Sequence, residues 1–157
     1  MRVALVAARW NPEITDALAA GALETARGAG AVVDSFTVAG SFELPAAVAL
    51  LADTGRYDAI VPLGCLIRGE TPHFDVLAQT VARGLLSLSL AYPVAIPFGV
   101  LTCDTLAQAR SRAGGRKGNK GAQAMEAALE LVALRAQIVS QRRSSRRAST
   151  AASRSTS

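Results

Sequence analysis

Four short apolar runs, separated by segments of helical pattern, constrain the fold of this 157-residue chain more than any other feature. The runs cover residues 3–8, 32–38, 58–66 and 94–101, and each is apolar along most of its length instead of at every second residue. Strands buried on both faces have this pattern, because the helices that connect parallel strands cover both sides of the sheet. The chain is therefore predicted to form an α/β three-layer sandwich, with a four-stranded parallel sheet between two layers of helices.

The segments that follow these runs have the composition and the apolar spacing of helices. The predicted helices begin after Pro12, cover residues 46–52, begin at Thr71-Pro72, cover residues 106–112 and extend from about residue 119 to residue 139. Thr71 is expected to be an N-cap and Pro72 the first helical residue, because these residue types are favoured at those positions. A glycine-rich turn over residues 114–118 separates the last two helices.

The formal charge of +5 is confined to one end of the chain. Residues 141–157 contain five arginines and no acidic residue, which leaves 12 of the 17 basic residues to balance 12 acidic ones in the rest of the chain. This segment has no hydrophobic side chain larger than alanine, so it cannot bury enough surface to offset the entropy cost of ordering. We predict one domain over residues 1–140 and a disordered basic tail over 141–157, favoured over an arm that binds nucleic acid or another polyanion.

The two cysteines and the apolar runs indicate the compartment. Cys65 and Cys103 lie in or beside apolar runs, where a thiol usually acts as a small buried hydrophobe, so we expect no disulfide and a reducing environment. The first apolar run is shorter than the roughly 7 to 15 residues of a signal-peptide core. No stretch approaches the ~18 apolar residues of a transmembrane helix. We therefore expect a soluble cytoplasmic protein that does not contact membranes.

Polar residues gather where the predicted strands end. Ligands of parallel α/β sheets bind beyond the carboxyl ends of the strands, which here are residues 9–11, 40–43, 64–73 and 98–102. His73, the only histidine, lies in the first turn of a predicted helix in this region. An imidazole transfers protons near neutral pH, so His73 is a candidate for catalysis, with a structural role as the alternative.

Two segments suggest that the ligand carries a phosphate. Free backbone N–H groups of residues 69–71, at the start of a helix, attract anions. Residues 112–121 form a glycine-rich loop with four cationic side chains, of which Arg112 can grip a phosphate through a two-pronged contact. The alternative interpretation of residues 112–121 is a basic loop that is solvated and binds no ligand. The loop lacks Walker-type spacing, so a small phosphorylated substrate is predicted and not a nucleoside triphosphate.

Aromatic side chains are rare, yet several lie at the predicted strand ends. They make up 4% of the chain, and Trp10, Phe42, Phe74 and Phe98 all lie at or just past the end of a strand. Core packing is the alternative for each, most of all for Phe74. Trp10 and Phe42 follow the points where the chain leaves the sheet, which suits an apolar wall for a flat heterocycle. Glu43, beside Phe42, can accept hydrogen bonds from a polyol. The alternative is that it is a solvated residue in the first turn of a helix.

Five strings, taken in order, resemble lumazine synthase. They are ARWN at residues 8–11, GSFELP at 40–45, GCLIRGETPHF at 64–74, PFGVLT at 97–102 and GNKG at 118–121. Each string alone is a weak signal, whereas their common order and intervals are specific, and RGETPHF is the most specific of them. The resemblance extends from Val3 to about Val139.

This resemblance implies a flavodoxin-like sandwich and the penultimate step of riboflavin biosynthesis. In that transferase reaction, 5-amino-6-(D-ribitylamino)uracil condenses with 3,4-dihydroxy-2-butanone 4-phosphate to give 6,7-dimethyl-8-ribityllumazine, phosphate and water. The family's mechanism passes through an imine, loses phosphate and closes the ring with loss of water. No metal and no organic cofactor is implied.

The resemblance also implies a role for individual residues, carried over by position. Trp10 is similar to the residue that stacks on the pyrimidine, and His73 to the residue that transfers protons. The remaining residues fall into four groups: Ser41, Phe42 and Glu43 for the ring and the ribityl chain; Cys65, Leu66 and Ile67 for the heterocycle through their backbone; Gly69, Glu70, Thr71 and Arg112 for the phosphate; and Phe98 and Lys120 as groups from a neighbouring subunit. The family builds each site between adjacent subunits of a pentamer, so a homo-oligomer is implied.

Other functions for the same fold stay open at this point. A non-catalytic shell or scaffold is one alternative, and a protein that binds flavin or lumazine without making it is another. A relative that joins two lumazines into riboflavin is a third. Trp10 stands where phenylalanine is frequent in the family, and the arginine-rich end is unlike the family's usual end.

Overall fold

The computed structural model describes the backbone of residues 1–154 and the side chains of residues 1–146 and 149. Helices and strands alternate along the first two thirds of the chain, as the apolar runs predict. The elements are β1 (Arg2–Ala8), α1 (Pro12–Gly28), β2 (Val32–Val38), the 3₁₀ turn η1 (Ser41–Glu43), α2 (Leu44–Asp53), β3 (Ala59–Ile67), α3 (His73–Ala91), β4 (Gly99–Cys103), α4 (Leu106–Arg112), β5 (Ala113–Gly115), β6 (Gly118–Asn119) and α5 (Lys120–Arg154).

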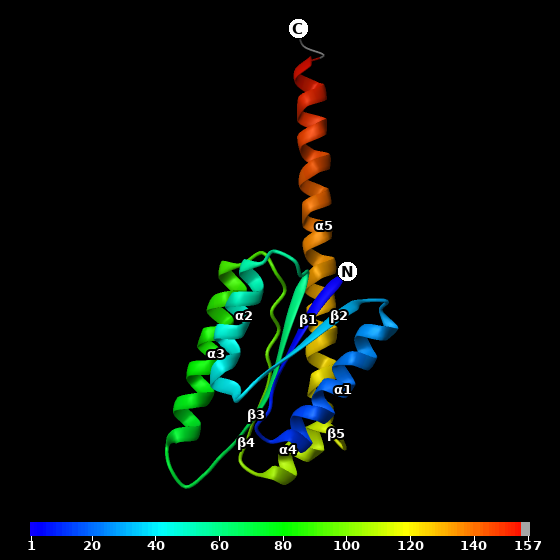
Figure 1. Cartoon of the computed structure of the whole chain (residues 1–157). Coiled ribbons are helices and arrows are strands. Elements are labelled where there is room, and N and C mark those ends of the chain that lie inside the picture. The colour runs from blue at the N-terminus through cyan, green and yellow to red at the C-terminus, as the bar shows by residue number, and fades with distance from the viewer. Residues whose placement is uncertain (155–157) are drawn as a thin grey trace.

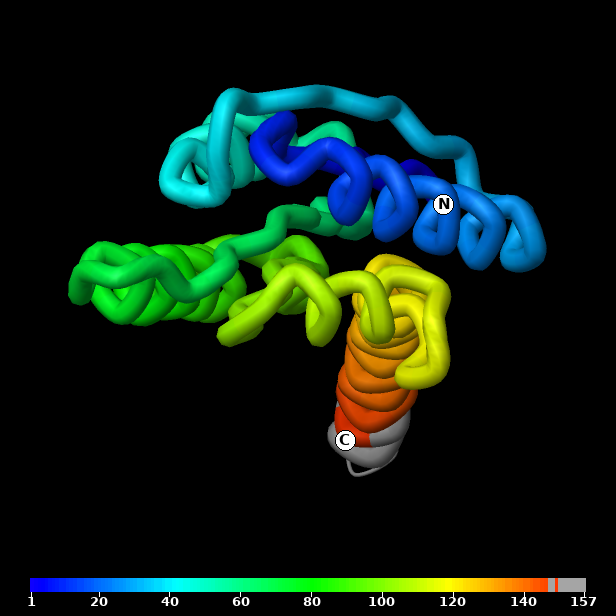
Figure 2. The backbone as a smooth tube through the Cα atoms, turned by 90° about the horizontal axis from the view of Figure 1, so that it is seen from below, coloured from blue at the N-terminus to red at the C-terminus, as the bar shows by residue number. Residues whose placement is uncertain are grey.

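The main sheet has the order β2-β1-β3-β4, and each neighbouring pair of strands is parallel. Figure 1 shows α2 and α3 on one face of this sheet and α1, α4 and α5 on the other. In Figure 2, which views the molecule from below, α5 is seen nearly end-on. The predicted three-layer sandwich with a four-stranded parallel sheet is confirmed.

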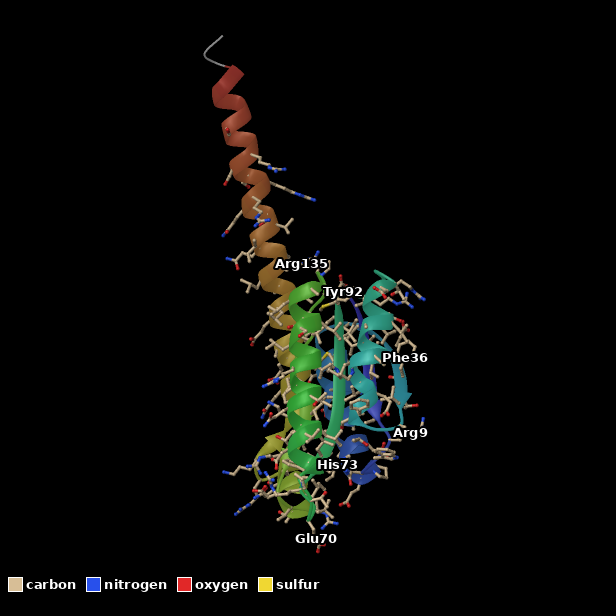
Figure 3. All side chains as sticks on the ribbon, turned by 90° about the vertical axis from the view of Figure 1, so that its left-hand side faces the viewer. Arg9, Phe36, Glu70, His73, Tyr92 and Arg135 are labelled. Carbon is tan, nitrogen blue, oxygen red and sulfur yellow. The ribbon has the colours of Figure 1, made fainter. Side chains whose placement is uncertain are left out.

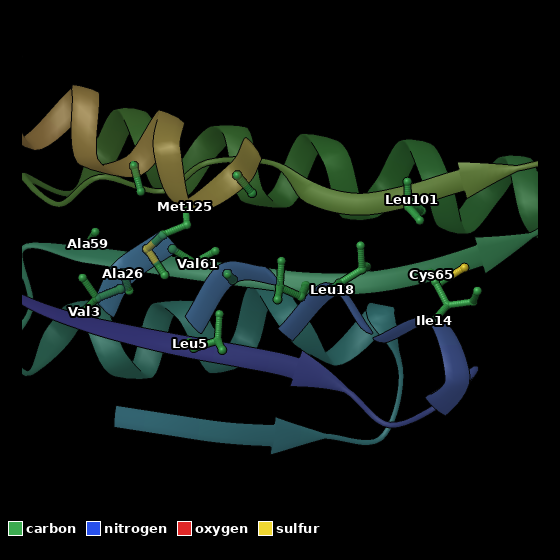
Figure 4. Close-up of a cluster of buried hydrophobic side chains, with 14 of the residues drawn as sticks. Val3, Leu5, Ile14, Leu18, Ala26, Ala59, Val61, Cys65, Leu101 and Met125 are labelled. Carbon is green, nitrogen blue, oxygen red and sulfur yellow. The ribbon is translucent and has the colours of Figure 1, made fainter. Parts of the chain in front are cut away.

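Alternate residues of each strand point into two separate cores, as the pleat of a strand requires. Val3 and Leu5 of β1 pack with α1 and α5 in the larger core, which Figure 4 shows. Ala4 and Val6 pack with α2 and α3 in the smaller one. The two central strands, β1 and β3, are buried on both faces and apolar along nearly their whole length, which is the pattern that revealed them. The edge strand β2 is mostly exposed and includes Asp34, Ser35 and Thr37.

The turn between β1 and α1 is fixed by Asn11. This residue adopts a left-handed conformation with φ 59°, which asparagine tolerates better than most residues, and Pro12 then starts the helix. The Asn11 side chain donates to the carbonyl of Cys65 at 2.9 Å. The end of β1 is thereby tied to the end of β3.

The start of α5 is fixed by Asn119 at the end of the β5–β6 hairpin. Its Oδ1 accepts from the backbone N–H groups of Gly121 at 2.8 Å and Ala122 at 3.1 Å. Its Nδ2 donates to the carbonyl of Ala17 in α1 at 2.9 Å. The two helices approach so closely that a Cβ at Gly121 would overlap the backbone of Leu18. This close approach sets where Lys120, the first residue of α5, lies.

Two predicted boundaries are wrong. The fourth strand is Gly99–Cys103 instead of residues 94–101, and before it only Ala95 bridges to Ala59. Pro93 and Pro97 lack the N–H groups that a ladder needs, which explains the late start. Helix α3 begins at His73, so Pro72 is the N-cap and not the first helical residue.

The backbone of α5 continues as a helix to Arg154, where the composition predicts irregular chain. Ser144 and Ser145 donate to carbonyls one turn earlier, and arginine and alanine favour helix. Residues 141–146 are exposed, and Figure 1 shows this end projecting beyond the sheet. A helix that packs on nothing is marginal in water, so disorder over 141–157 stays a prediction. Residues 155–157 of the predicted tail lie outside the described residues.

Within residues 1–154, no helix has the length and apolar character to cross a membrane.

Candidate active site

The first part of the candidate site is an aromatic wall at the ends of β1 and β2. Trp10 and Phe42 expose 65% and 57% of their surface. The Trp10 ring lies against the backbone of Gly40, where a Cβ would come within 2.5 Å of it. Glu43 accepts from the Gly40 N–H at 3.0 Å through Oε2. The Ser41 side chain is buried behind this turn, whereas the rings of Trp10 and Phe42 remain open to solvent.

The end of β3 supplies a backbone edge beside this wall. The ladder of β3 with β1 ends at the pair Ala7–Leu63, whereas its ladder with β4 continues to Ile67. Residues 64–67 therefore have one side outside the sheet, where the Asn11 amide donates to the Cys65 carbonyl. Leu66 and Ile67 are partly buried on opposite faces. Such an edge offers hydrogen bonds to a flat heterocycle.

Arg68 holds the loop that leads to His73. Its guanidinium bonds Asp104 at 2.8 Å and Asp75 at 2.9 Å and lies 4.5 Å from the centre of the Phe74 ring. The two carboxylates raise the pKa of Arg68, with Asp75 the larger cause. Sequence reasoning gave Arg68 no role, because its partner Asp104 lies 36 positions away.

His73 is exposed at the first residue of α3, and the Thr71 hydroxyl accepts from its backbone N–H at 3.4 Å. Gly69, Glu70 and Thr71 are exposed on the loop just before it. Figure 3 shows His73 and Glu70 at the end of the molecule opposite Tyr92 and Arg135. The histidine and the predicted anion loop are thus neighbours at the carboxyl ends of the strands.

A separate pocket of about 460 Å³ contains the remaining predicted residues. Phe98, Arg112 and Lys120 line it, together with Lys117, Thr102 and Gln123. Arg112 donates to the carbonyl of Gln108 at 3.2 Å, which orients its guanidinium along α4. The structure therefore groups Arg112 with Phe98 and Lys120, and residues 69–73 do not line this pocket. The sequence pattern indicates only that Lys117 belongs to a basic loop, whereas the structure places it in the pocket lining.

The two thiols are buried and free. Burial, with a smaller contribution from nearby Cys103, raises the pKa of Cys65 to about 12. Burial also raises the pKa of Cys103. Neither thiol is therefore ionised near neutral pH, which argues against nucleophilic roles. Among the described residues, no three His, Cys, Asp or Glu side chains gather as ligands for a metal ion.

The family model for 6,7-dimethyl-8-ribityllumazine synthase matches residues 1–136. The chain belongs to the lumazine synthase family. A lumazine synthase of Frankia casuarinae is 51% identical over 138 residues, covering 85% of each chain. One of Methylobacterium radiotolerans is 48% identical over 134 residues, covering 85% of this chain and 82% of the relative. One of Gemmatimonas aurantiaca is 47% identical over 136 residues, covering 85% and 83%. The part that matches the lumazine synthase family includes every predicted site residue and ends before the basic end of α5.

Proposed function

We propose that this chain catalyses the condensation of 5-amino-6-(D-ribitylamino)uracil with 3,4-dihydroxy-2-butanone 4-phosphate. The products are 6,7-dimethyl-8-ribityllumazine, phosphate and water, and the reaction belongs to riboflavin biosynthesis. The observation that carries the proposal is the match to the lumazine synthase family over residues 1–136. Every residue that the sequence assigns to the reaction lies within this range.

The aromatic wall and the β3 edge suit the pyrimidine substrate. Trp10 and Phe42 present open ring faces for stacking on the uracil. Backbone groups of Cys65, Leu66 and Ile67 are assigned to the polar edge of the ring. Glu43 and Ser41 are assigned to the ribityl hydroxyls, since a carboxylate oxygen remains after the bond to the Gly40 N–H.

His73 is assigned to proton transfer during imine formation and ring closure. The reaction needs two reactants held together and modest acid and base help, which one histidine beside an anion loop supplies. Residues 69–71 are assigned to the phosphate, which leaves as an anion and so gains from free backbone N–H groups. No step of this mechanism calls for a thiolate, in keeping with the raised pKa of the Cys65 thiol.

The pocket around Arg112 is assigned to a neighbouring subunit. In one chain Phe98, Arg112 and Lys120 share a pocket that does not include His73 or its loop. A homo-oligomer built from pentamers, with sites between subunits, would bring this pocket to the His73 loop of the next chain. Arg112 and Lys120 would then hold the substrate phosphate from the second side. The free thiols fit a reducing compartment, and we assign the protein to the cytoplasm.

The test is to mix purified protein with both substrates and follow lumazine absorbance and fluorescence against an enzyme-free control. Faster lumazine formation with one phosphate released per lumazine is expected. A rate equal to the control, from folded protein, would leave a scaffold or a flavin-binding protein of the same fold. Riboflavin formed from lumazine alone would instead identify the enzyme that joins two lumazines.

A further inference from the structure

The charge of the chain is segregated onto the last turns of α5. Residues 141–154, which we call the basic arm, contain five arginines and no acidic residue. The rest of the chain is balanced, with 12 basic and 12 acidic residues. The last acidic residue, Glu130, lies 12 positions before Arg142, which is about 18 Å along a helix. The arm thus keeps its positive charge without compensation from its own helix.

The helical backbone places these arginine positions on one side. At 100° per residue, positions 142, 143, 146, 147 and 154 fall within an arc of about 140°. Arg142 and Arg143 are exposed, and neither has a hydrogen-bond or ion-pair partner in the part of the chain that the structure describes. A one-sided row of arginines about 18 Å long matches an extended polyanion better than a single phosphate.

The arm is remote from the proposed active site. Figure 1 shows it projecting beyond the end of the sheet where the strands begin, whereas α4 and β5 lie at the other end. His73 and Glu70 also lie at that other end in Figure 3. The arm is also outside the 1–136 range that matches the lumazine synthase family. Within one chain, the arm therefore lies away from the proposed active site.

We propose that the basic arm binds nucleic acid through the phosphodiester backbone, without reading the sequence. Arginine favours phosphate because its planar guanidinium forms two parallel hydrogen bonds. Residues 141–157 include no aromatic side chain to stack on bases. They also include no apolar side chain larger than alanine, which an amphipathic helix needs to insert into a lipid surface. Of these modes of binding, the residues of the arm support only contact with phosphate groups.

The test is a titration of the full chain against a fluorescein-labelled DNA duplex of about 20 base pairs, read by anisotropy. Five phosphate contacts predict a log–log salt slope of about −4.5 per bound chain, and a 10²- to 10³-fold weaker affinity at 200 mM than at 50 mM salt. A second duplex of unrelated sequence is expected to bind within about threefold. Failure to bind at 50 mM salt would overturn the proposal.

Two variants with the same five substitutions separate charge from fold. They are R142Q, R143Q, R146Q, R147Q and R154Q together, and the same five positions changed to lysine. The glutamine variant is expected to lose DNA binding at 50 mM salt, and the lysine variant to keep most of it. Both should keep the circular dichroism and the lumazine turnover of the parent chain. Unchanged DNA binding by the glutamine variant would contradict the proposal.

Vesicles of phosphatidylcholine with phosphatidylserine distinguish a membrane from a nucleic acid. The vesicles attract arginines by charge alone, since the arm has no apolar face to insert. We expect the duplex, whose charge density is higher, to bind more tightly and to be displaced only in part. Binding to the vesicles in preference to the duplex would refute the assignment. Millimolar inorganic phosphate is expected to compete only as ordinary salt, and displacement beyond the salt effect would point to a single-phosphate site instead.

Discussion

His73 is the side chain whose replacement tests the proposed chemistry most directly. It is exposed at the start of α3 and packs in neither core, so His73→Ala should fold as the parent chain does. Loss of general acid and base help should slow lumazine formation about 10-fold to 100-fold or more. Steady-state turnover measures this, with Gln79→Ala, an exposed change on the same helix, as the control. Equal rates for both variants would remove His73 from the mechanism.

Arg68 tests whether the loop before His73 must be held in place. Its interactions with Asp75, Asp104 and Phe74 tie the end of β3 to α3 and to the turn before α4. Removing it should misplace the loop by a fraction of an ångström to an ångström and lower kcat/KM by about 10-fold. Exposed ion pairs contribute little to stability, so the melting temperature should barely change.

The control for Arg68→Ala is Arg83→Ala, which removes the same charge from an exposed position on α3. The two variants are compared by kcat/KM for the butanone phosphate. A loss of activity shared equally by both would indicate an effect of net charge instead of the loop.

The raised pKa of Cys65 predicts how stability depends on pH. The folded state holds the thiol proton up to about pH 12, whereas the unfolded chain releases it near the ordinary thiol pKa of 9.0. Above pH 9 the unfolded state therefore binds fewer protons, so the free energy of unfolding should fall as pH rises. Urea titrations between pH 8 and pH 9.5, below the ordinary tyrosine pKa of 10.0, measure this. Cys65→Ala should show a flatter pH dependence, and an equal slope would assign the loss to other groups.

At the scale of elements, the crossing of α1 and α5 positions half of the candidate site. Gly121 lies where a Cβ would overlap the backbone of Leu18, so Gly121→Ala should separate the two helices. We expect a loss of about 2–3 kcal/mol in the free energy of unfolding, as for other overpacked positions. Gly28→Ala is the control, because no atom lies within 4 Å of its Cβ position. That change should be neutral or stabilising, and urea titrations of both variants give the comparison.

Apolar runs predicted β1 and β3 to within one residue, because burial on both faces is visible in the sequence. The β-branched and aromatic residues of 32–38 predicted β2, although this edge strand is mostly exposed. β4 was placed too early since its apolar run includes Pro97, which cannot join a ladder. The order of the strands is set by packing between distant segments, so the apolar runs did not predict it. The composition argument for the basic arm concerns burial and not local propensity, and disorder over 141–157 stays a prediction.

The places of the candidate site residues could be predicted where the interactions are local. The wall of Trp10 and Phe42 and the loop before His73 follow from their places at strand ends. The ion pairs of Arg68 and the pocket that brings Arg112 close to Phe98 join residues far apart in the sequence, so sequence patterns did not show them. The residue roles themselves stay predictions until variants are measured.

At the scale of the whole molecule, the division of the site into two parts predicts that two defective chains can help each other. His73→Ala damages one part, and Arg112→Ala damages the pocket that we assign to a neighbouring subunit. Arg112→Ala alone should mainly raise KM for the butanone phosphate, because this guanidinium is assigned to the phosphate of that substrate. Each variant is expected to be poorly active when it assembles with itself.

Chains of the two variants, unfolded together and refolded as a mixture, should form rings in which some sites combine two intact parts. When equal amounts assemble at random in a ring with one kind of interface, about a quarter of all sites combine an intact His73 with an intact Arg112. The activity of the mixture should therefore rise well above that of either variant alone. Mixing the variants after each has folded provides the control, because assembled rings exchange chains only if they dissociate. Activity that stays at the mean of the two variants after joint refolding would show that each site lies within one chain, and would place Arg112 and His73 in the same subunit's site.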